Sequence, residues 1–342
     1  MKDISSTSFQ QMLTYKGGGT EKKIGSSFFR GKTGVQLNPY KKDYDNNLFL
    51  KKYILKGWVP DHPPISQNTQ ITAFGSCFAR NISKHLAKRK FNMTSASSPE
   101  IYISYMGEGM VNVHAIAQQF EWALEDKKIP DGLWHGWKAE DYGVSEDVRL
   151  KTKEAFLKTD FFIITLGLSE VWEDTVTGEI FWRAVPLKNY DENRHKFRVL
   201  TMEETKLKLE KIYSLIRLHI PKAQVLFTLS PVPLAATFRD ISCITANSVS
   251  KSILRASLDE FLREKALDNK INLFYFPSFE IISELFYEKF LDDGRHPKPE
   301  IIELIMIMFE GSFCNSEIDW HQVEQSFKEL RKKNLMDLLA EN

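Results

Sequence analysis

The apolar residues of the chain follow two alternating patterns, continuous runs of strand length and longer stretches with helical spacing. Continuous runs are typical of strands buried on both faces of a parallel sheet. They occupy residues 71–74, 91–95, 161–166, 224–228 and 271–276. Apolar residues three and four positions apart are typical of amphipathic helices. They occupy residues 78–86, 113–124, 147–158, 201–218, 241–267 and 279–290. This alternation predicts a doubly wound α/β domain around a mostly parallel sheet of about five strands.

Two segments between the predicted strand at 161–166 and the predicted helix at 201–218 have different patterns. Residues 171–183 alternate around Thr177-Gly178, which predicts a β-hairpin inserted after the strand at 161–166. Residues 191–198 are polar and charged, and we expect them to form a surface loop.

The two ends of the chain differ from this core. Residues 1–66 are polar and rich in Gly, Ser and Lys, and they end in Asp61-His62-Pro63-Pro64, a rigid linker. Residues 317–341 form a charged amphipathic pattern, which predicts a helix that docks on the chain or joins copies in a homo-oligomer. We therefore expect an irregular N-terminal arm at 1–66, an α/β domain at 67–315 and a helical tail at 316–342.

The composition is that of an ordinary globular protein. Of its 342 residues, 42% are hydrophobic and 27% charged, with a net charge of +1, so neither nucleic acid nor a membrane surface is an expected partner. Cys77, Cys243 and Cys314 lie far apart without metal-ligand or disulfide spacing. We expect a cytoplasmic protein without a signal peptide, integral membrane segment, metal or cofactor.

The first stretch that carries candidate chemistry is Thr72 to Arg80. A short apolar run reaches Gly75-Ser76-Cys77, and a helical pattern follows at once. Strand, tight turn and helix place a nucleophile at the carboxyl edge of a sheet, and glycine permits the sharp turn. The residues after it lie at a helix N-terminus, which stabilises a thiolate or an oxyanion. The alternative is a helix capped by Ser76 and followed by a buried cysteine.

The second stretch is Asp292-Asp293-Gly294-Arg295-His296-Pro297, between two predicted helices near the end of the domain. An Asp and a His three residues apart on a loop can converge on one nucleophile. The carboxylate then orients the imidazole, and the imidazole takes the proton of the nucleophile. Together, the two stretches predict a hydrolase-type site.

Gly75-Ser76-Cys77-Phe78-Ala79 resembles the signature of the GSCFA-domain family, which belongs to the SGNH (GDSL-like) hydrolase superfamily. The resemblance extends from about Asn38-Pro39-Tyr40 to about Phe313. It includes residues 107–112, 166–172, 229–233, 247–251 and 275–278. It implies a three-layer α/β/α fold and hydrolytic or acyl-transfer chemistry on an ester. Many relatives accompany surface-polysaccharide biosynthesis.

The resemblance also implies groups that stabilise an oxyanion. The candidates in one loop are Gly107, Gly109 and Asn112, although this loop can equally be a helix start capped by Asn112. Gly167-Leu168-Ser169-Glu170 stands where the superfamily has Gly-x-Asn-Asp, so Ser169 takes the Asn position and Glu170 the Asp position. A serine hydroxyl can still donate, whereas losing one donor costs about 100- to 1000-fold in rate.

The identity of the nucleophile stays open between two neighbours. The superfamily motif is Gly-Asp-Ser-Leu, and its register puts Cys77 in the nucleophile position and Ser76 where Asp usually stands. We favour Cys77, because a thiolate suits a histidine partner and a helix N-terminus. His296 is then the base, and the superfamily's Asp-x-x-His spacing selects Asp293 over Asp292 as its partner.

Three functions fit these residues. The first is an ester hydrolase or O-acyltransferase acting on a carbohydrate or glycolipid in surface-polysaccharide biosynthesis. The second is a catalytically weak scaffold that binds saccharide or a biosynthetic partner. The third is an intracellular acyl thioesterase. An enzyme of this type requires that His296 and Asp293 meet Cys77 or Ser76 at the carboxyl edge of the sheet.

Overall fold

The computed structural model describes residues 11–17, 20–26, 36, 38–105, 109–130, 132–134, 144–267 and 272–340. The chain divides into two units, residues 1–46 and 47–342. The first contains the antiparallel hairpin of β1 (Gln11–Gly17) and β2 (Thr20–Ser26) and the short helix η2 (Lys41–Asp45). The sequence pattern does not predict this hairpin, because its strands lack apolar alternation.

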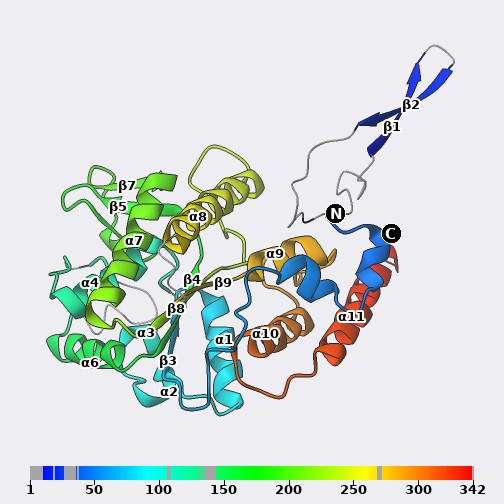
Figure 1. The fold of residues 1–342 in the computed structure, drawn as a ribbon. Helices are drawn as coiled ribbons and strands as arrows, with labels where there is room; N and C mark the ends of the chain where they lie inside the picture. Colours follow the sequence, from blue (N-terminus) through cyan, green and yellow to red (C-terminus); the bar gives the residue numbers. More distant parts are fainter. Residues whose placement is uncertain are drawn as a thin grey trace. The chain divides into compact units, whose positions relative to one another are not determined.

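The second unit is built on a four-stranded parallel sheet (Figure 1). Its strands in spatial order are β3 (Ile71–Phe74), β4 (Phe161–Leu166), β8 (Gln224–Leu229) and β9 (Leu273–Phe276). All four coincide closely with predicted apolar runs. Every residue of β4 is buried, as expected for a central strand covered on both faces.

The predicted strand at residues 91–95 is wrong. This segment makes only a single parallel bridge, from Met93 to Ile71, and helix α2 (Thr94–Ser97) begins directly after it. The Thr94 hydroxyl lies 2.7 Å from the Thr72 hydroxyl and 2.9 Å from the Gln70 amide. These side-chain bonds hold the start of α2 against β3, so the ladder ends after one pair.

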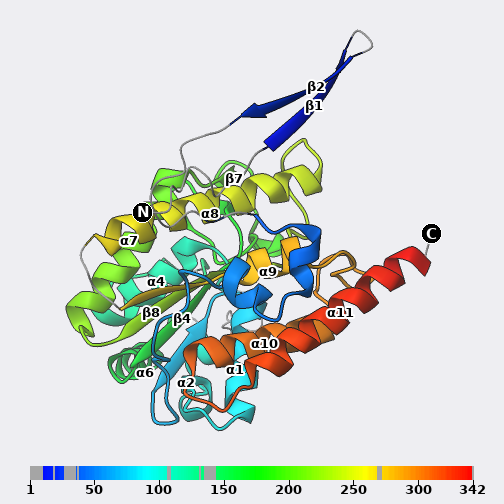
Figure 2. The ribbon, with the colours of Figure 1, turned by 45° about the vertical axis from the view of Figure 1, so that its right-hand side comes forward.

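Helices cover both faces of the sheet. On one face, α4 (Val113–Glu125) packs against α7 (Met202–His219), and α7 packs against α8 (Cys243–Ala266). On the other face lie α1 (Cys77–Lys88) and α10 (Pro299–Phe313), which Figure 2 shows opposite α7 and α8. Alternate strand residues therefore face different helices.

Aromatic contacts show this alternation along neighbouring strands. Phe227 of β8 meets Phe261 of α8, with ring centroids 5.8 Å apart. Phe276 of β9 meets Phe309 of α10 at 5.3 Å, and Phe274 meets Phe313 at 5.9 Å. Side chains of a strand point alternately to opposite faces, so residues of the same sheet build two separate apolar layers.

The segment after β4 forms a second, antiparallel sheet with the order β6-β5-β7. The hairpin of β5 (Glu170–Asp174) and β6 (Glu179–Ile180) confirms the predicted insert. The predicted surface loop at residues 191–198 is confirmed only for residues 191–194, which form a turn at the surface, because residues 195–198 belong to β7 (His195–Val199), which pairs with β5. Phe197 lies opposite Trp172 in this pairing. The charged residues that make this strand look like a loop in the sequence have partners within the protein.

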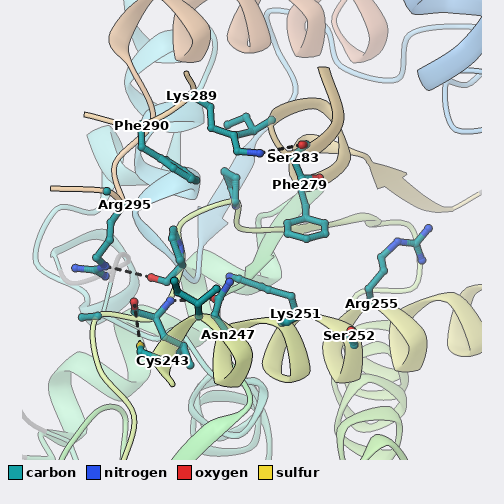
Figure 3. Close-up of a pocket in the computed structure, with 18 of the residues that line it drawn as sticks. Cys243, Asn247, Lys251, Ser252, Arg255, Phe279, Ser283, Lys289, Phe290 and Arg295 are labelled. Carbon is teal, nitrogen blue, oxygen red and sulfur yellow. Dashed lines mark hydrogen bonds between the residues drawn. The ribbon is translucent and has the colours of Figure 1, made fainter. Parts of the chain in front are cut away.

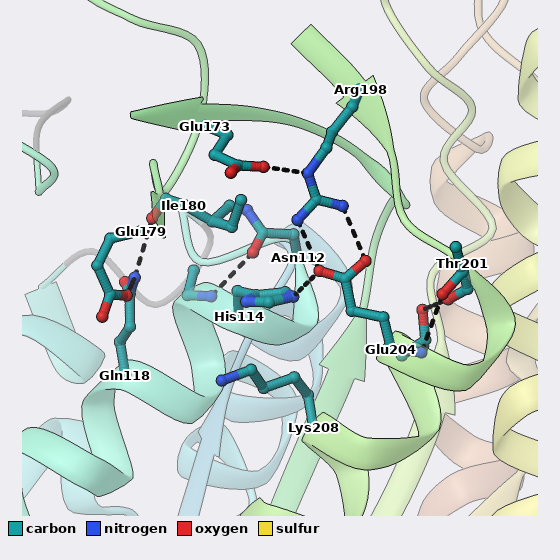
Figure 4. Close-up of polar contacts among 12 residues, drawn as sticks. Asn112, His114, Gln118, Glu173, Glu179, Ile180, Arg198, Thr201, Glu204 and Lys208 are labelled. Carbon is teal, nitrogen blue, oxygen red and sulfur yellow. Dashed lines mark hydrogen bonds and ion pairs between the residues drawn. The ribbon is translucent and has the colours of Figure 1, made fainter. Parts of the chain in front are cut away.

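The pairing of those charges joins the insert to α4 and α7 (Figure 4). Arg198 of β7 donates to both carboxylate oxygens of Glu204, at 2.7 and 2.8 Å, and to Glu173 of β5. His114 of α4 lies 2.9 Å from Glu204. Burial lowers the pKa of His114, which favours the neutral imidazole within this network.

The remaining elements surround this framework. They are η3 (Leu50–Ile54), α3 (Tyr102–Tyr105), α6 (Glu146–Leu157), η4 (Leu187–Asn189), α9 (Ser278–Leu285) and α11 (Trp320–Ala340). Helix α9 ends before residue 290, where the prediction places its end. The Asn334 side chain of α11 accepts hydrogen bonds from the backbone of Tyr287 and Glu288, which holds the chain outside a helix there.

The C-terminal helix α11 packs against α10 of the same chain. Val323 and Phe327 are buried, and Phe327 stacks on Phe49 with ring centroids 5.4 Å apart. Met336 and Leu339 are exposed near its end. The apolar residues in the first half of α11 are therefore buried by docking on the same chain. Within the described part of the chain, no helix combines the length and apolar character needed to cross a bilayer.

Candidate active site

The turn between β3 and α1 requires a glycine. Gly75 has a φ of +130°, and a Cβ at this position would lie 2.1 Å from the carbonyl oxygen of Thr165 on β4. Ser76 follows in an extended conformation as the N-cap of α1, and its hydroxyl accepts a hydrogen bond of 3.2 Å from the Phe78 N–H. Cys77 is the first residue of the helix. The predicted strand, turn and helix are therefore confirmed.

Ser76 and Cys77 have different environments. Ser76 is 3% exposed and its hydroxyl is occupied in capping the helix. Cys77 is half-buried, forms no disulfide, and borders two cavities at the carboxyl edge of the sheet. The thiol is thus the more accessible of the two nucleophiles.

Backbone contacts join the two ends of the loop that contains Asp293 and His296. Phe290 and Pro297 form an antiparallel bridge, and the Leu291 N–H donates 2.8 Å to the His296 carbonyl. Gly294, with a φ of +65°, makes the turn at its tip. This closure fixes the backbone on both sides of His296, which positions its ring relative to the sheet.

Within this loop, the partner of the histidine is Asp293. One carboxylate oxygen of Asp293 accepts from the backbone N–H groups of Arg295 and His296, both at 2.9 Å, and the other is bonded to the His296 Nδ1. The hydrogen bond to His296 and the two backbone bonds hold the pKa of Asp293 well below its usual range. An ionised carboxylate at Nδ1 fixes the ring so that Nε2 is the nitrogen that exchanges protons.

The structure brings the two stretches together around two cavities. Cys77 and His296 border both of them, one of about 290 Å³ and one of about 280 Å³. Ser76, Gly167 and Ser230 also line the larger one. Gly167 follows β4 and Ser230 follows β8, so the cavity lies at the carboxyl ends of three parallel strands. Such edges are where open α/β sheets bind ligands.

The predicted oxyanion groups divide into those at the cavity and those away from it. Gly167 lines the cavity, although its N–H donates to the Val111 carbonyl at 2.8 Å. Ser169 is buried and both its N–H and its hydroxyl donate to Ser250, while Glu170 is buried on β5 with Arg239 at 4.0 Å. Neither Ser169 nor Glu170 lines the two cavities.

The loop before α4 supports the capping alternative. The Asn112 oxygen accepts from the Ala115 N–H at 2.8 Å, and its amide nitrogen donates to the carbonyls of Phe181 and Trp182 at 3.1 Å. Asn112 is therefore fully engaged as a helix cap. Gly109 is buried, and Gly107 lies outside the described residues.

Sequence reasoning missed Lys251, which is 3% exposed. Its Nζ donates to the carbonyl oxygens of Gly167 at 2.6 Å and Ser230 at 2.8 Å. Burial lowers the pKa of Lys251 to about 7, while the charge of Cys77 acts in the opposite direction and that of Arg295 adds to the lowering. A sequence signal existed, because Lys251 shares helical spacing with Leu254 and Leu258 on an otherwise apolar stripe of α8.

Two arginines also border the cavity that contains Cys77 and His296. The Arg295 Nε donates to the Pro233 carbonyl at 3.2 Å, and the Arg183 Nε to the Gly109 carbonyl at 3.4 Å. With Lys251, they place positive charge around the thiol. This field favours negative charge that develops on a reacting group.

Fold and site together define an α/β protein in which a strand–turn–helix element carrying Ser76 and Cys77 shares two cavities with His296, which is hydrogen-bonded to Asp293. The chain belongs to the GSCFA family, because the model of this family matches residues 70–309, which contain both parts of the site. No curated protein matches the chain.

Proposed function

We propose that the protein is an ester hydrolase or O-acyltransferase of the SGNH type, with Cys77 as nucleophile, His296 as base and Asp293 as its orienting partner. The observation that carries this proposal is that Cys77 and His296 border the same two cavities while His296 is bonded to Asp293. Covalent acyl transfer requires a nucleophile next to a base, and a third group that orients the base.

In the first half-reaction, His296 takes the proton of the Cys77 thiol through Nε2. The Cys77 sulfur attacks the carbonyl carbon of the ester, and the carbonyl oxygen becomes an oxyanion. The N-terminus of α1 and the positive charges of Arg183 and Arg295 favour this negative charge. When the tetrahedral intermediate collapses, the carbon–oxygen bond of the ester breaks and the leaving alcohol takes the proton from His296. The acyl group remains on Cys77 as a thioester.

In the second half-reaction, His296 takes a proton from water or from the hydroxyl group of an acceptor. The oxygen attacks the thioester carbonyl, the carbon–sulfur bond breaks, and Cys77 recovers its proton from His296. Water gives a carboxylic acid, and an alcohol gives a new ester. A carbohydrate or glycolipid from surface-polysaccharide biosynthesis is the acceptor or substrate that we propose, on the basis of the family resemblance.

The choice of Cys77 over Ser76 rests on the helix cap that the Ser76 hydroxyl forms and on the greater exposure of Cys77. The Ser76 hydroxyl accepts from the Phe78 N–H, so attack by this oxygen would give up the cap of α1. Losing such a cap costs about 1 kcal/mol. Cys77 can react without that loss.

The test is turnover of p-nitrophenyl acetate by the wild type and by Cys77→Ala, Ser76→Ala and His296→Ala, with intact-mass detection of an acetyl adduct. We expect that Cys77→Ala and His296→Ala lose turnover, that the adduct maps to Cys77, and that Ser76→Ala keeps most of its activity below its unfolding temperature. Equally low turnover in all four proteins with no adduct, for p-nitrophenyl acetate and also for longer-chain p-nitrophenyl esters, would contradict an enzyme and favour a binding scaffold.

A further inference from the structure

A cavity of about 1110 Å³ lies beside the candidate active site, between α8, α9 and the segment that leads to His296 (Figure 3). It is much larger than the two cavities that Cys77 borders. Its size is comparable with ligand cavities that enclose drug-sized molecules, about 300–1,000 Å³. An acetyl group would leave nearly all of it unfilled.

The lining of this cavity is mainly apolar. Phe279 and Ile282 come from α9, Phe290 from the following segment, and Leu234 from the loop after β8. Figure 3 shows Phe279 and Phe290 on the side of the cavity opposite α8. Ile244, near the start of α8, is 83% exposed and lines the cavity, which leaves apolar surface open to a ligand.

Three charged or amide side chains of the lining are engaged by the protein itself, whereas the buried Ser283 hydroxyl has no hydrogen-bond partner among the described residues. Arg255 donates to Glu280 at 2.6 Å and lies 3.5 Å from Asp259. Lys289 donates to the Ser283 carbonyl at 2.9 Å, and the Asn247 oxygen accepts from the Leu234 N–H at 3.1 Å. A saccharide needs many partners for its hydroxyl groups, whereas an apolar chain needs none. Because most of the wall is apolar, the lining favours an apolar chain.

This cavity adjoins the one that contains the nucleophile. Pro233, Leu234 and Arg295 line both of them. Lys251 lines the large cavity, while its Nζ is bound to carbonyls of the site. The two cavities thus share a wall, and the proposal below requires that a group attached to Cys77 extend past Pro233 and Leu234 into the apolar space.

We propose that this cavity binds the acyl chain of the substrate, so that the protein acts on esters of medium- or long-chain fatty acids rather than on acetyl esters. This inference rests on the proposed function. Burying a methylene group is worth about 0.8 kcal/mol, so each added methylene raises kcat/KM up to about fourfold until the chain fills the cavity.

The first experiment measures kcat/KM for p-nitrophenyl esters from acetate to palmitate. We expect a rise of at least about 100-fold between acetate and the best chain length. Ala256→Trp places an indole group inside the cavity, because Ala256 lines it, and should reduce this rise without changing acetate turnover. Ala266→Trp, an exposed position at the end of the same helix, is the matched control. A flat chain-length profile in an active wild type would overturn the inference and leave the proposed function intact.

The second experiment measures binding of dodecanoate to Cys77→Ala by calorimetry, which needs no turnover. We expect binding that Ala256→Trp weakens at least about tenfold and Ala266→Trp leaves unchanged. Dodecanoate binding without turnover of any ester would contradict the proposed function and support the assignment of the cavity as a site for an apolar chain. Absence of dodecanoate binding, or equal binding in the Ala256→Trp protein, would overturn the inference.

Discussion

The side-chain nitrogen of Lys251 donates a hydrogen bond of 2.6 Å to the carbonyl oxygen of Gly167, the residue that follows β4. It donates a second, of 2.8 Å, to the carbonyl oxygen of Ser230, the residue that follows β8. Both carbonyls belong to the wall of the cavity that Cys77 borders. Lys251 therefore joins two strand ends beneath the site and brings a positive charge into electrostatic reach of the thiol.

If this charge supports the reactive state of Cys77, Lys251→Met should slow alkylation of Cys77 by iodoacetamide about tenfold near pH 6.5, which corresponds to about one unit of pKa or 1.4 kcal/mol. The rate is measured by intact mass and peptide mapping, because Cys243 is also half-buried. Lys251→Arg keeps the charge and is the control that should react nearly as fast as the wild type. Equal rates for Lys251→Met and the wild type would contradict a role of Lys251 at the thiol.

The buried lysine also predicts how stability depends on pH. In the unfolded chain Lys251 keeps its proton up to about pH 10.4. In the folded chain its pKa is about 7, because burial disfavours the charge. Between these values the unfolded state binds more protons, so the free energy of unfolding should rise as pH increases from about 7 to 10.

Urea unfolding from about pH 6.5 to 9.5 tests this dependence. The rise should be present in the wild type and largely absent from Lys251→Met, and the difference between the two proteins removes the contribution of other titrating groups. The same slope in both proteins would show that Lys251 keeps an ordinary pKa in the folded chain.

The neighbours Asp292 and Asp293 offer a matched pair for the site. Asp293→Asn replaces the carboxylate that holds the His296 ring by an amide, and should lower kcat for a p-nitrophenyl ester by up to about 10⁴-fold with little change in KM. Asp292→Asn removes the same charge from an exposed position one residue away and should leave kcat unchanged. Equal effects of the two substitutions would indicate that only the charge of the loop matters.

Part of this architecture could be predicted because it depends on local sequence. Four buried strands appear as continuous apolar runs, and Gly75 with Ser76 marks the turn into α1. The spacing of Asp293 and His296 likewise predicts their pairing, which the structure contains. In each case, neighbours along the chain determine the geometry.

The parts that could not be predicted depend on partners far away in the sequence. Strand β7 looks like a polar loop until Arg198 is paired with Glu204 and Phe197 with Trp172. The place of Lys251 on the apolar stripe of α8 indicates that it is buried, but its hydrogen-bond acceptors are carbonyls of Gly167 and Ser230, far away in the sequence. Periodicity reports which residues are apolar, but it does not report which polar residues find a buried partner.

Gly75 gives the sharpest test of the turn that carries the nucleophile. In Gly75→Ala the new Cβ would lie 2.1 Å from the Thr165 carbonyl oxygen, a backbone atom of the central strand that cannot move aside. We expect loss of esterase activity and a destabilisation beyond the roughly 1–3 kcal/mol that an unfavourable φ alone costs. Gly178→Ala is the control, because Gly178 also has a positive φ, +72°, but no atom lies within 4 Å of its Cβ position. Chemical denaturation of both variants separates strain from clash, and equal losses of stability would mean that β3 shifts to accommodate the methyl group.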